Sequence, residues 1–99
     1  MAETWTARAA VATDAAERYA KQLAAHLGRR AEVREEPGGR RVVLGDGSCL
    51  LVAGDTVLEL SAEAPSAESL ERVQHVVGSH LERFGSRREL VVDWSGPTS

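Results

Sequence analysis

The stretch of sequence that decides the fold is HLERFGSRRELVVDW, residues 80–94. Its first five residues complete an amphipathic helix, with apolar side chains at steps of three and four. That apolar stripe consists of Leu70, Val73, Val77, Leu81 and Phe84. Gly85 ends the helix, and a turn rich in Arg and Glu follows. Residues 90–94 are typical of a strand, so we expect the helix to lead directly into the last strand of a sheet.

Upstream of this helix, the chain predicts a first strand and a first helix. Residues 4–11 alternate between apolar and polar side chains, which is typical of a half-buried strand. Asp14 and Glu17 have the spacing of a capping box, and Gly28 ends the helix that they would begin. Ser66 is the expected N-cap of the helix that ends at Gly85.

Four strands are expected between the two helices, at residues 31–35, 40–44, 49–53 and 56–63. Glycine-rich turns separate them, which indicates consecutive hairpins in an antiparallel sheet. The predicted class is therefore α+β, a two-layer sandwich of order β-α-β-β-β-β-α-β with both helices on one face. Its layout is similar to the TATA-binding-protein-like or helix-grip arrangement, an analogy that carries no function.

We expect residues 1–99 to form a single domain that is ordered over about 4–94, with a frayed tail from residue 96. The side chains expected beneath the helices are Trp5, Leu44, Leu51, Leu58, Leu60, Val92 and Trp94.

Charge and composition exclude several classes of function. The net charge is −3, and the pairs Arg29-Arg30, Arg40-Arg41 and Arg87-Arg88 lie close to acids, so we expect solvated turn charges and no nucleic-acid partner. The single cysteine cannot form an internal disulfide. The N-terminus lacks the features of a signal peptide, and no apolar run approaches the roughly 20 residues of a membrane span. We therefore expect a cytoplasmic protein without a membrane partner.

An ordered set of motifs runs along nearly the whole chain. It comprises Arg18-Tyr19, Lys21-Gln22-Leu23, His26, Gly47-Ser48-Cys49, Leu51, Glu63-Ala64-Pro65 and the stretch from His80 to Trp94. With this set, residues 4–94 resemble the domain of unknown function 2218 family of small bacterial proteins.

The resemblance implies a non-enzymatic binding or accessory module without a cofactor. Similar domains are associated with siderophore-interacting proteins, so the resemblance also implies a role in iron or siderophore handling, with a siderophore-interacting protein as partner.

Three residues suggest an alternative, a metal-binding or redox protein. His80 lies on the inward stripe of the second helix, His26 flanks the stripe of the first helix, and Cys49 shares a strand face with Leu51. If they converge, two imidazoles and a thiolate suit zinc or iron. The other interpretation is a small buried cysteine with two hydrogen-bonded histidines at helix edges.

Signals for other chemistry are few. Arg83 and Arg87 could bind an anion, or they could belong to a structural network of ion pairs with the interleaved acids. No nucleophile elbow, Walker loop or dinucleotide fingerprint is present in the sequence, so we do not expect an enzyme.

The sheet face opposite the helices is expected to carry Val43, Leu50, Val52, Val57 and Val91. Contiguous apolar side chains on an uncovered sheet mark an interface or a ligand surface. We expect a homodimer through this face, with scattered exposed valines of ordinary strand propensity as the alternative.

Overall fold

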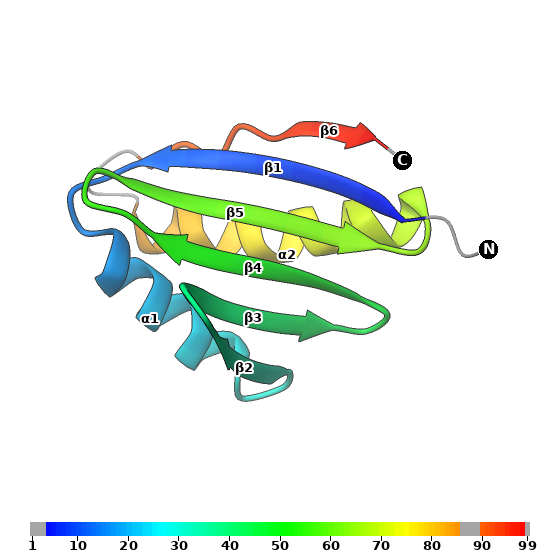
Figure 1. Ribbon diagram of the computed structural model, residues 1–99, viewed down its shortest axis with the longest axis horizontal. Coiled ribbons are helices and arrows are strands. Elements are labelled where there is room, and N and C mark those ends of the chain that lie inside the picture. The colour runs from blue at the N-terminus through cyan, green and yellow to red at the C-terminus, as the bar shows by residue number, and fades with distance from the viewer. Residues whose placement is uncertain (1–3, 86–89, 99) are drawn as a thin grey trace.

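The computed structural model describes residues 4–85 and 90–98, and it confirms the α+β class and the predicted order of elements (Figure 1). The helices are α1 (Ala16–Leu27) and α2 (Ala67–Phe84). The strands are β1 (Trp5–Ala12), β2 (Glu32–Glu36), β3 (Gly39–Leu44), β4 (Gly47–Ala53), β5 (Val57–Ala64) and β6 (Ser95–Thr98).

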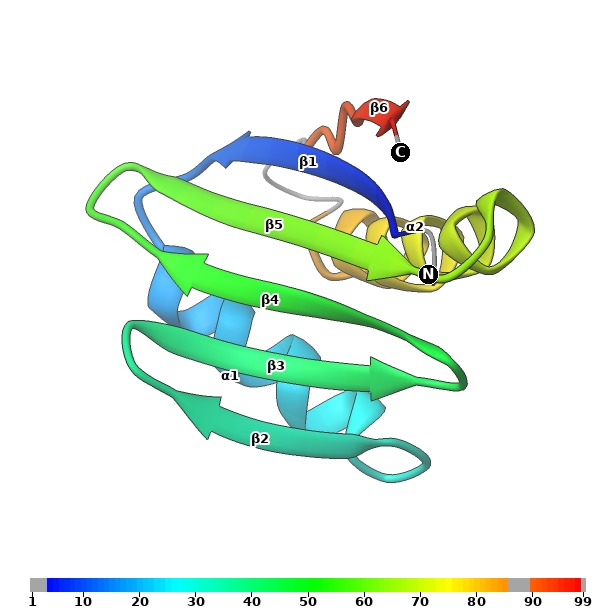
Figure 2. The same ribbon diagram turned by 45° about the vertical axis from the view of Figure 1, so that its right-hand side comes forward.

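The strands form one antiparallel sheet in the order β2-β3-β4-β5-β1-β6 (Figure 2). Tight turns connect β2 to β5 as a meander, and Gly38 and Gly45 adopt φ of 83° and 64° in two of these turns. Such positive φ values favour glycine, as expected from the turn sequences. The exposed edge strand β2 carries Glu32, Arg34, Glu35 and Glu36, and such charges oppose pairing with a further strand.

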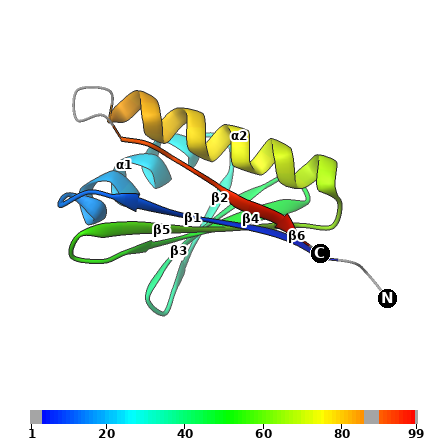
Figure 3. The same ribbon diagram turned by 90° about the horizontal axis from the view of Figure 1, so that it is seen from above.

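Both helices cover the same face of the sheet, which gives the two predicted layers (Figure 3). Helix α1 packs on β3, β4 and β5, whereas α2 packs on β1, β4 and β5. The two helices also contact each other. One cluster of buried side chains fills the space between these layers.

The predicted core is largely confirmed. Leu51, Leu58 and Leu60 of the sheet are at most 1% exposed. The helices contribute the fully buried side chains of Leu23, Leu70, Val73, Val77 and Leu81. Trp5, Leu44 and Phe84 are half-buried and pack against the cluster, as do Val92 and Trp94.

The two helices begin in different ways. The Ser66 hydroxyl accepts a hydrogen bond of 3.1 Å from the amide of Ser69, so the predicted N-cap of α2 is confirmed. The capping box predicted for α1 is wrong, because the N-cap residue is Ala15 and it makes no side-chain cap hydrogen bond. The Glu17 carboxylate accepts instead from Arg40 of β3 at 2.7 Å, which ties α1 to the sheet.

The prediction for the last strand is also wrong in position. Residues 90–94 form no strand, and β6 occupies the residues that were expected to fray. The segment instead lies against α2, where the Val92 amide donates to the Glu82 carboxylate at 3.0 Å. Gly78 makes this packing feasible, since an added Cβ would lie 3.2 Å from Nε1 of Trp94. Val91, expected on the open sheet face, is 67% exposed on this segment.

Neither of the helices in the described residues has the length and apolar character that a membrane span requires.

The packing of α2 gives a first prediction. Leu81→Ala removes a fully buried side chain and should lower the free energy of unfolding by about 2–5 kcal/mol. Urea denaturation followed by circular dichroism measures this change. Val91→Ala, at an exposed position, is the control and should alter stability by less than about 0.5 kcal/mol. A similarly small effect of Leu81→Ala would show that the stripe of α2 is not part of the core.

Candidate functional site

A pocket of about 530 Å³ lies where the C-terminal halves of α1 and α2 meet. Its apolar lining comes from both helices, the segment after α1 and the end of β3. Those apolar residues are Leu27, Ala31, Leu44 and Val76. The polar lining is His26, Arg29, Arg30 and His80, and we call the whole the histidine pocket. Its volume is in the range of about 300–1,000 Å³ that is usual for small-molecule sites.

His80 enters the pocket from α2. It stands one helical turn after Val76, whose carbonyl oxygen lies 2.6 Å from His80 Nδ1. Since a carbonyl oxygen only accepts, Nδ1 carries the proton of this hydrogen bond. In the neutral ring Nε2 is therefore left with a lone pair.

His26 enters from the last turn of α1 and meets His80 across the helix contact. The centroids of the two imidazoles are 5.0 Å apart, with 45° between the ring planes. Phe84, one turn after His80 on α2, also contacts His26, in an edge-to-face arrangement with a centroid distance of 5.4 Å. The structure thus brings together the two histidines that the sequence analysis singled out.

Arginine supplies the charge of the pocket. Arg29 and Arg30 follow the end of α1, and no carboxylate of residues 4–85 and 90–98 lines the pocket with them. Four other hollows on the described surface each include at least two carboxylates. In a chain of net charge −3, the histidine pocket therefore stands out as cationic.

Cys49 is not part of this pocket lining. The thiol is completely buried in β4, and this burial raises its pKa to about 12. Cysteine binds metals as the thiolate, which a pKa of this size disfavours. Within residues 4–85 and 90–98, no group of three His, Cys, Asp or Glu side chains could hold a metal ion.

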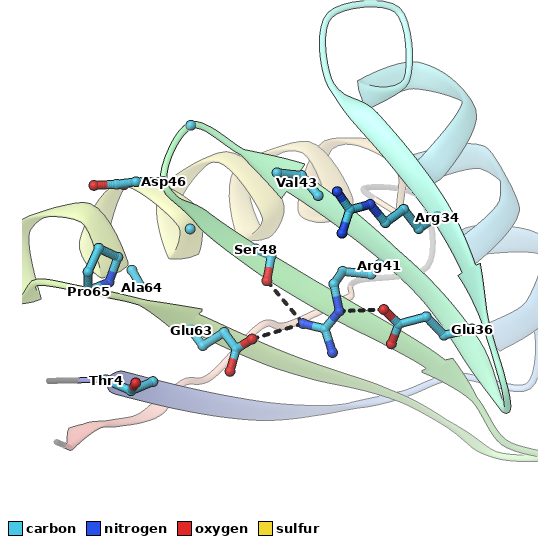
Figure 4. Close-up of a pocket in the computed structure, with 12 residues that line it drawn as sticks. Thr4, Arg34, Glu36, Arg41, Val43, Asp46, Ser48, Glu63, Ala64 and Pro65 are labelled. Carbon is cyan, nitrogen blue, oxygen red and sulfur yellow. Dashed lines mark hydrogen bonds and ion pairs between the residues drawn. The ribbon is translucent and has the colours of Figure 1, made fainter. Parts of the chain in front are cut away.

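A second hollow, of about 630 Å³, lies on the open face of the sheet around Arg41 (Figure 4). The Arg41 guanidinium donates to Glu36 at 2.7 Å, to the Ser48 hydroxyl at 3.0 Å and to Glu63 at 3.2 Å. The hydrogen bond from Arg41 holds the pKa of the Glu36 carboxyl below its ordinary value, and the same bond raises the pKa of Arg41. Because two carboxylates neutralise this arginine, the network is suited to holding β2, β3, β4 and β5 together.

The open face also carries the four apolar residues predicted as an interface. By the register of the strands, Val43, Leu50, Val52 and Val57 form a diagonal band across β3, β4 and β5. All four side chains are half-buried by their neighbours.

The predicted anion site at Arg83 and Arg87 is only partly described. Arg83 is exposed in the last turn of α2, and no ion pair joins it to another described residue. Arg87 lies outside the described residues.

The arginines of the histidine pocket were not predicted as site residues from the sequence. Arg29 and Arg30 were expected to be solvated turn charges, and both side chains are exposed. Their position directly after a helix that contains His26 is the signal that could have placed them beside it.

The fold and the pocket define a small α+β domain with two helices on one face of an antiparallel sheet and a cationic hollow between those helices. The chain belongs to the DUF2218 family, described as an uncharacterised protein conserved in bacteria, whose model matches residues 8–95.

A solved structure has a similar fold. The chain is similar to the protein of the NMR structure of PA4090 from Pseudomonas aeruginosa, with 29% sequence identity and a TM-score of 0.79. The similarity covers 96% of this chain and 99% of the other. No match was found among curated proteins.

The burial of Cys49 gives a second prediction. Because the thiol is enclosed and its pKa is about 12, iodoacetamide at pH 8 should alkylate the native protein at least a hundredfold more slowly than the protein in 6 M guanidinium. Mass spectrometry of samples quenched over time measures both rates. Equal rates in the two conditions would mean that Cys49 is accessible in the folded protein.

Proposed function

We propose that the protein is a non-enzymatic binding module of the cytoplasm whose histidine pocket holds a small anionic ligand. The observation that carries the proposal is the lining of the pocket, where the described part of the chain contributes two arginines, two histidines and no carboxylate. Arg29 and Arg30 can each donate two parallel hydrogen bonds to a carboxylate or phosphate. The four apolar side chains of the lining offer a surface for the carbon skeleton of the ligand.

The surroundings of Cys49 and Ser48, two possible nucleophiles, support a non-enzymatic role. The Cys49 thiol is fully buried with its pKa raised to about 12, and the Ser48 hydroxyl accepts a hydrogen bond from Arg41. A serine or thiol nucleophile requires an adjacent base or a lowered pKa.

The family resemblance adds a more specific proposal, an accessory role in iron or siderophore handling with a siderophore-interacting protein as partner. Many iron chelates are anionic and rich in oxygen, so they belong to the class of ligand that the arginines favour. The alternative of a metal or redox site built from His26, Cys49 and His80 is less well supported, because the buried thiol does not line the pocket.

Citrate is a suitable first probe for the anion site. Titration into the 15N-labelled protein should shift the amide signals of residues 26–31 and of Val76 and His80. Arg29→Ser combined with Arg30→Ser should weaken binding about tenfold or more, since a hydrogen bond to a charged group contributes about 1.5–3 kcal/mol.

Arg8→Ser combined with Arg72→Ser gives a control of the same net charge with an intact histidine pocket. This control should bind citrate as the wild type does. Equal weakening of citrate binding in both double variants would mean that the net charge of the protein, and not the pocket, determines binding. If citrate, inorganic phosphate and ferric citrate all fail to shift the amide signals of the pocket, the proposal is contradicted.

We further propose that two copies of the chain pair through the open sheet face. A two-fold axis would place the band of Val43, Leu50, Val52 and Val57 against its own copy, and Arg41 with its carboxylates would form a polar rim. Burial of this apolar area would contribute roughly 25 cal/mol per Å².

Leu50→Glu should then convert the dimer to a monomer without changing the circular dichroism spectrum, because the charge would have to be buried in the interface. Val91→Glu introduces the same charge off this face and is the control. Sedimentation velocity over a range of concentrations measures the assembly state. A wild-type protein that stays monomeric at millimolar concentration would rule out the pairing.

A further inference from the structure

We infer that His26 and His80 together bind one divalent transition-metal ion, of which Zn²⁺ is the reference case, and leave its other coordination positions open. The site lies within the proposed pocket, but it needs no anionic ligand to exist. It departs from the sequence-based expectation that no metal is bound, because the structure brings the two imidazole rings into contact, with 5.0 Å between their centroids.

The separation of the rings is the first observation. A neutral imidazole binds zinc with a Zn–N distance of about 2.0–2.1 Å, which puts the ring centroid about 3.2 Å from the ion. Two imidazoles at the tetrahedral angle therefore have centroids about 5 Å apart. The observed distance between the centroids of His26 and His80 is 5.0 Å.

The hydrogen bond of His80 is an independent second observation. A histidine that ligates a metal usually donates its other ring N–H to a carboxylate, a carbonyl or water, which fixes the tautomer and the orientation of the ring. Here Nδ1 donates to the Val76 carbonyl at 2.6 Å. Nε2, the nitrogen that would bind the metal, is left with its lone pair.

The ends of the two helices partly offset the positive charge of Arg29 and Arg30 beside these rings. His26 lies in the last turn of α1, and His80 lies one turn before the end of α2 at Phe84. The C-terminal ends of helices carry partial negative charge, which stabilises nearby cations. Phe84, one turn after His80 on α2, also contacts the His26 ring edge to face, at a centroid distance of 5.4 Å.

Two protein ligands leave room for a ligand from solution. No third His, Cys, Asp or Glu of the described residues joins the pair in a metal-binding group. Zinc is commonly four-coordinate, so two positions would be taken by water or by an oxygen ligand. Here the inference rests on the proposed function, since Arg29 and Arg30 line the same pocket and would pair with an anion bound to the metal.

Isothermal titration of zinc chloride into the tag-free protein tests the site, in a weakly coordinating buffer at pH 7.5 without citrate. The wild type should bind one zinc ion per chain. His26→Gln and His80→Gln should each weaken binding at least tenfold, provided that their circular dichroism spectra show native folding.

The chain contains its own control in His75, which stands five residues before His80 on α2, is exposed and does not line the histidine pocket. His75→Gln should change zinc affinity less than twofold. Cys49→Ser should have an equally small effect, and the cobalt-substituted wild type should lack the near-ultraviolet thiolate-to-metal absorption of a cysteine ligand.

Three results would overturn the inference: no stoichiometric zinc binding by the wild type, an equal loss in the His75 variant, or a thiolate band that disappears in the Cys49 variant. A protein that binds citrate alone but not zinc would contradict the metal site and keep the anion pocket. A protein that binds zinc but not citrate would contradict the anion pocket and keep the metal site.

Discussion

The close packing of α2 on the sheet is the constraint on which the rest of the structure depends. An added Cβ at Gly47 would lie only 2.7 Å from Cγ2 of Val73, so the helix leaves no space for a side chain at this point of β4. Buried alanines of β1 and β5, among them Ala7 and Ala62, continue this small-residue surface. With α2 in this position, α1 covers the rest of the same face and meets α2 at His26 and His80. The pocket is therefore a consequence of how two helices share one sheet.

Most of the fold could be predicted because it depends on local patterns. Ser66 and Gly85 mark the ends of α2, the apolar stripe to Leu81 faces the core, and glycine turns such as Gly45 separate the strands. The position of the last strand could not be predicted in this way. Residues 90–94 have the composition of a strand, but the segment lies against α2, with Trp94 next to Gly78 and the Val92 amide bonded to Glu82. This contact surface of α2 exists only once the helix has folded, and no local sequence pattern describes it.

The candidate site, like the fold, could be predicted only where it depends on local sequence patterns. Helical periodicity correctly placed His80 toward the layer contact and His26 at the edge of its stripe. It could not show whether Cys49 would reach them, because that depends on how two helices cross a strand from another part of the chain. The outcome is a thiol buried in β4 with a pKa of about 12, and a cationic lining completed by Arg29 and Arg30. Charged residues after the end of a helix are common, so only the packing of the two helices distinguishes Arg29 and Arg30 from other surface charges.

The central claim is that the histidine pair is the binding centre of this domain. Long-range 1H–15N spectra of the three imidazoles, recorded with and without zinc, test it most directly because each ring nitrogen is observed. The account predicts that His80 is the Nδ1–H tautomer in the free protein, as its bond to Val76 requires. Zinc should then shift the Nε2 signal of His80 and one ring nitrogen of His26, and leave His75 unchanged. An Nε2–H tautomer of His80, or a zinc response confined to His75, would contradict the account.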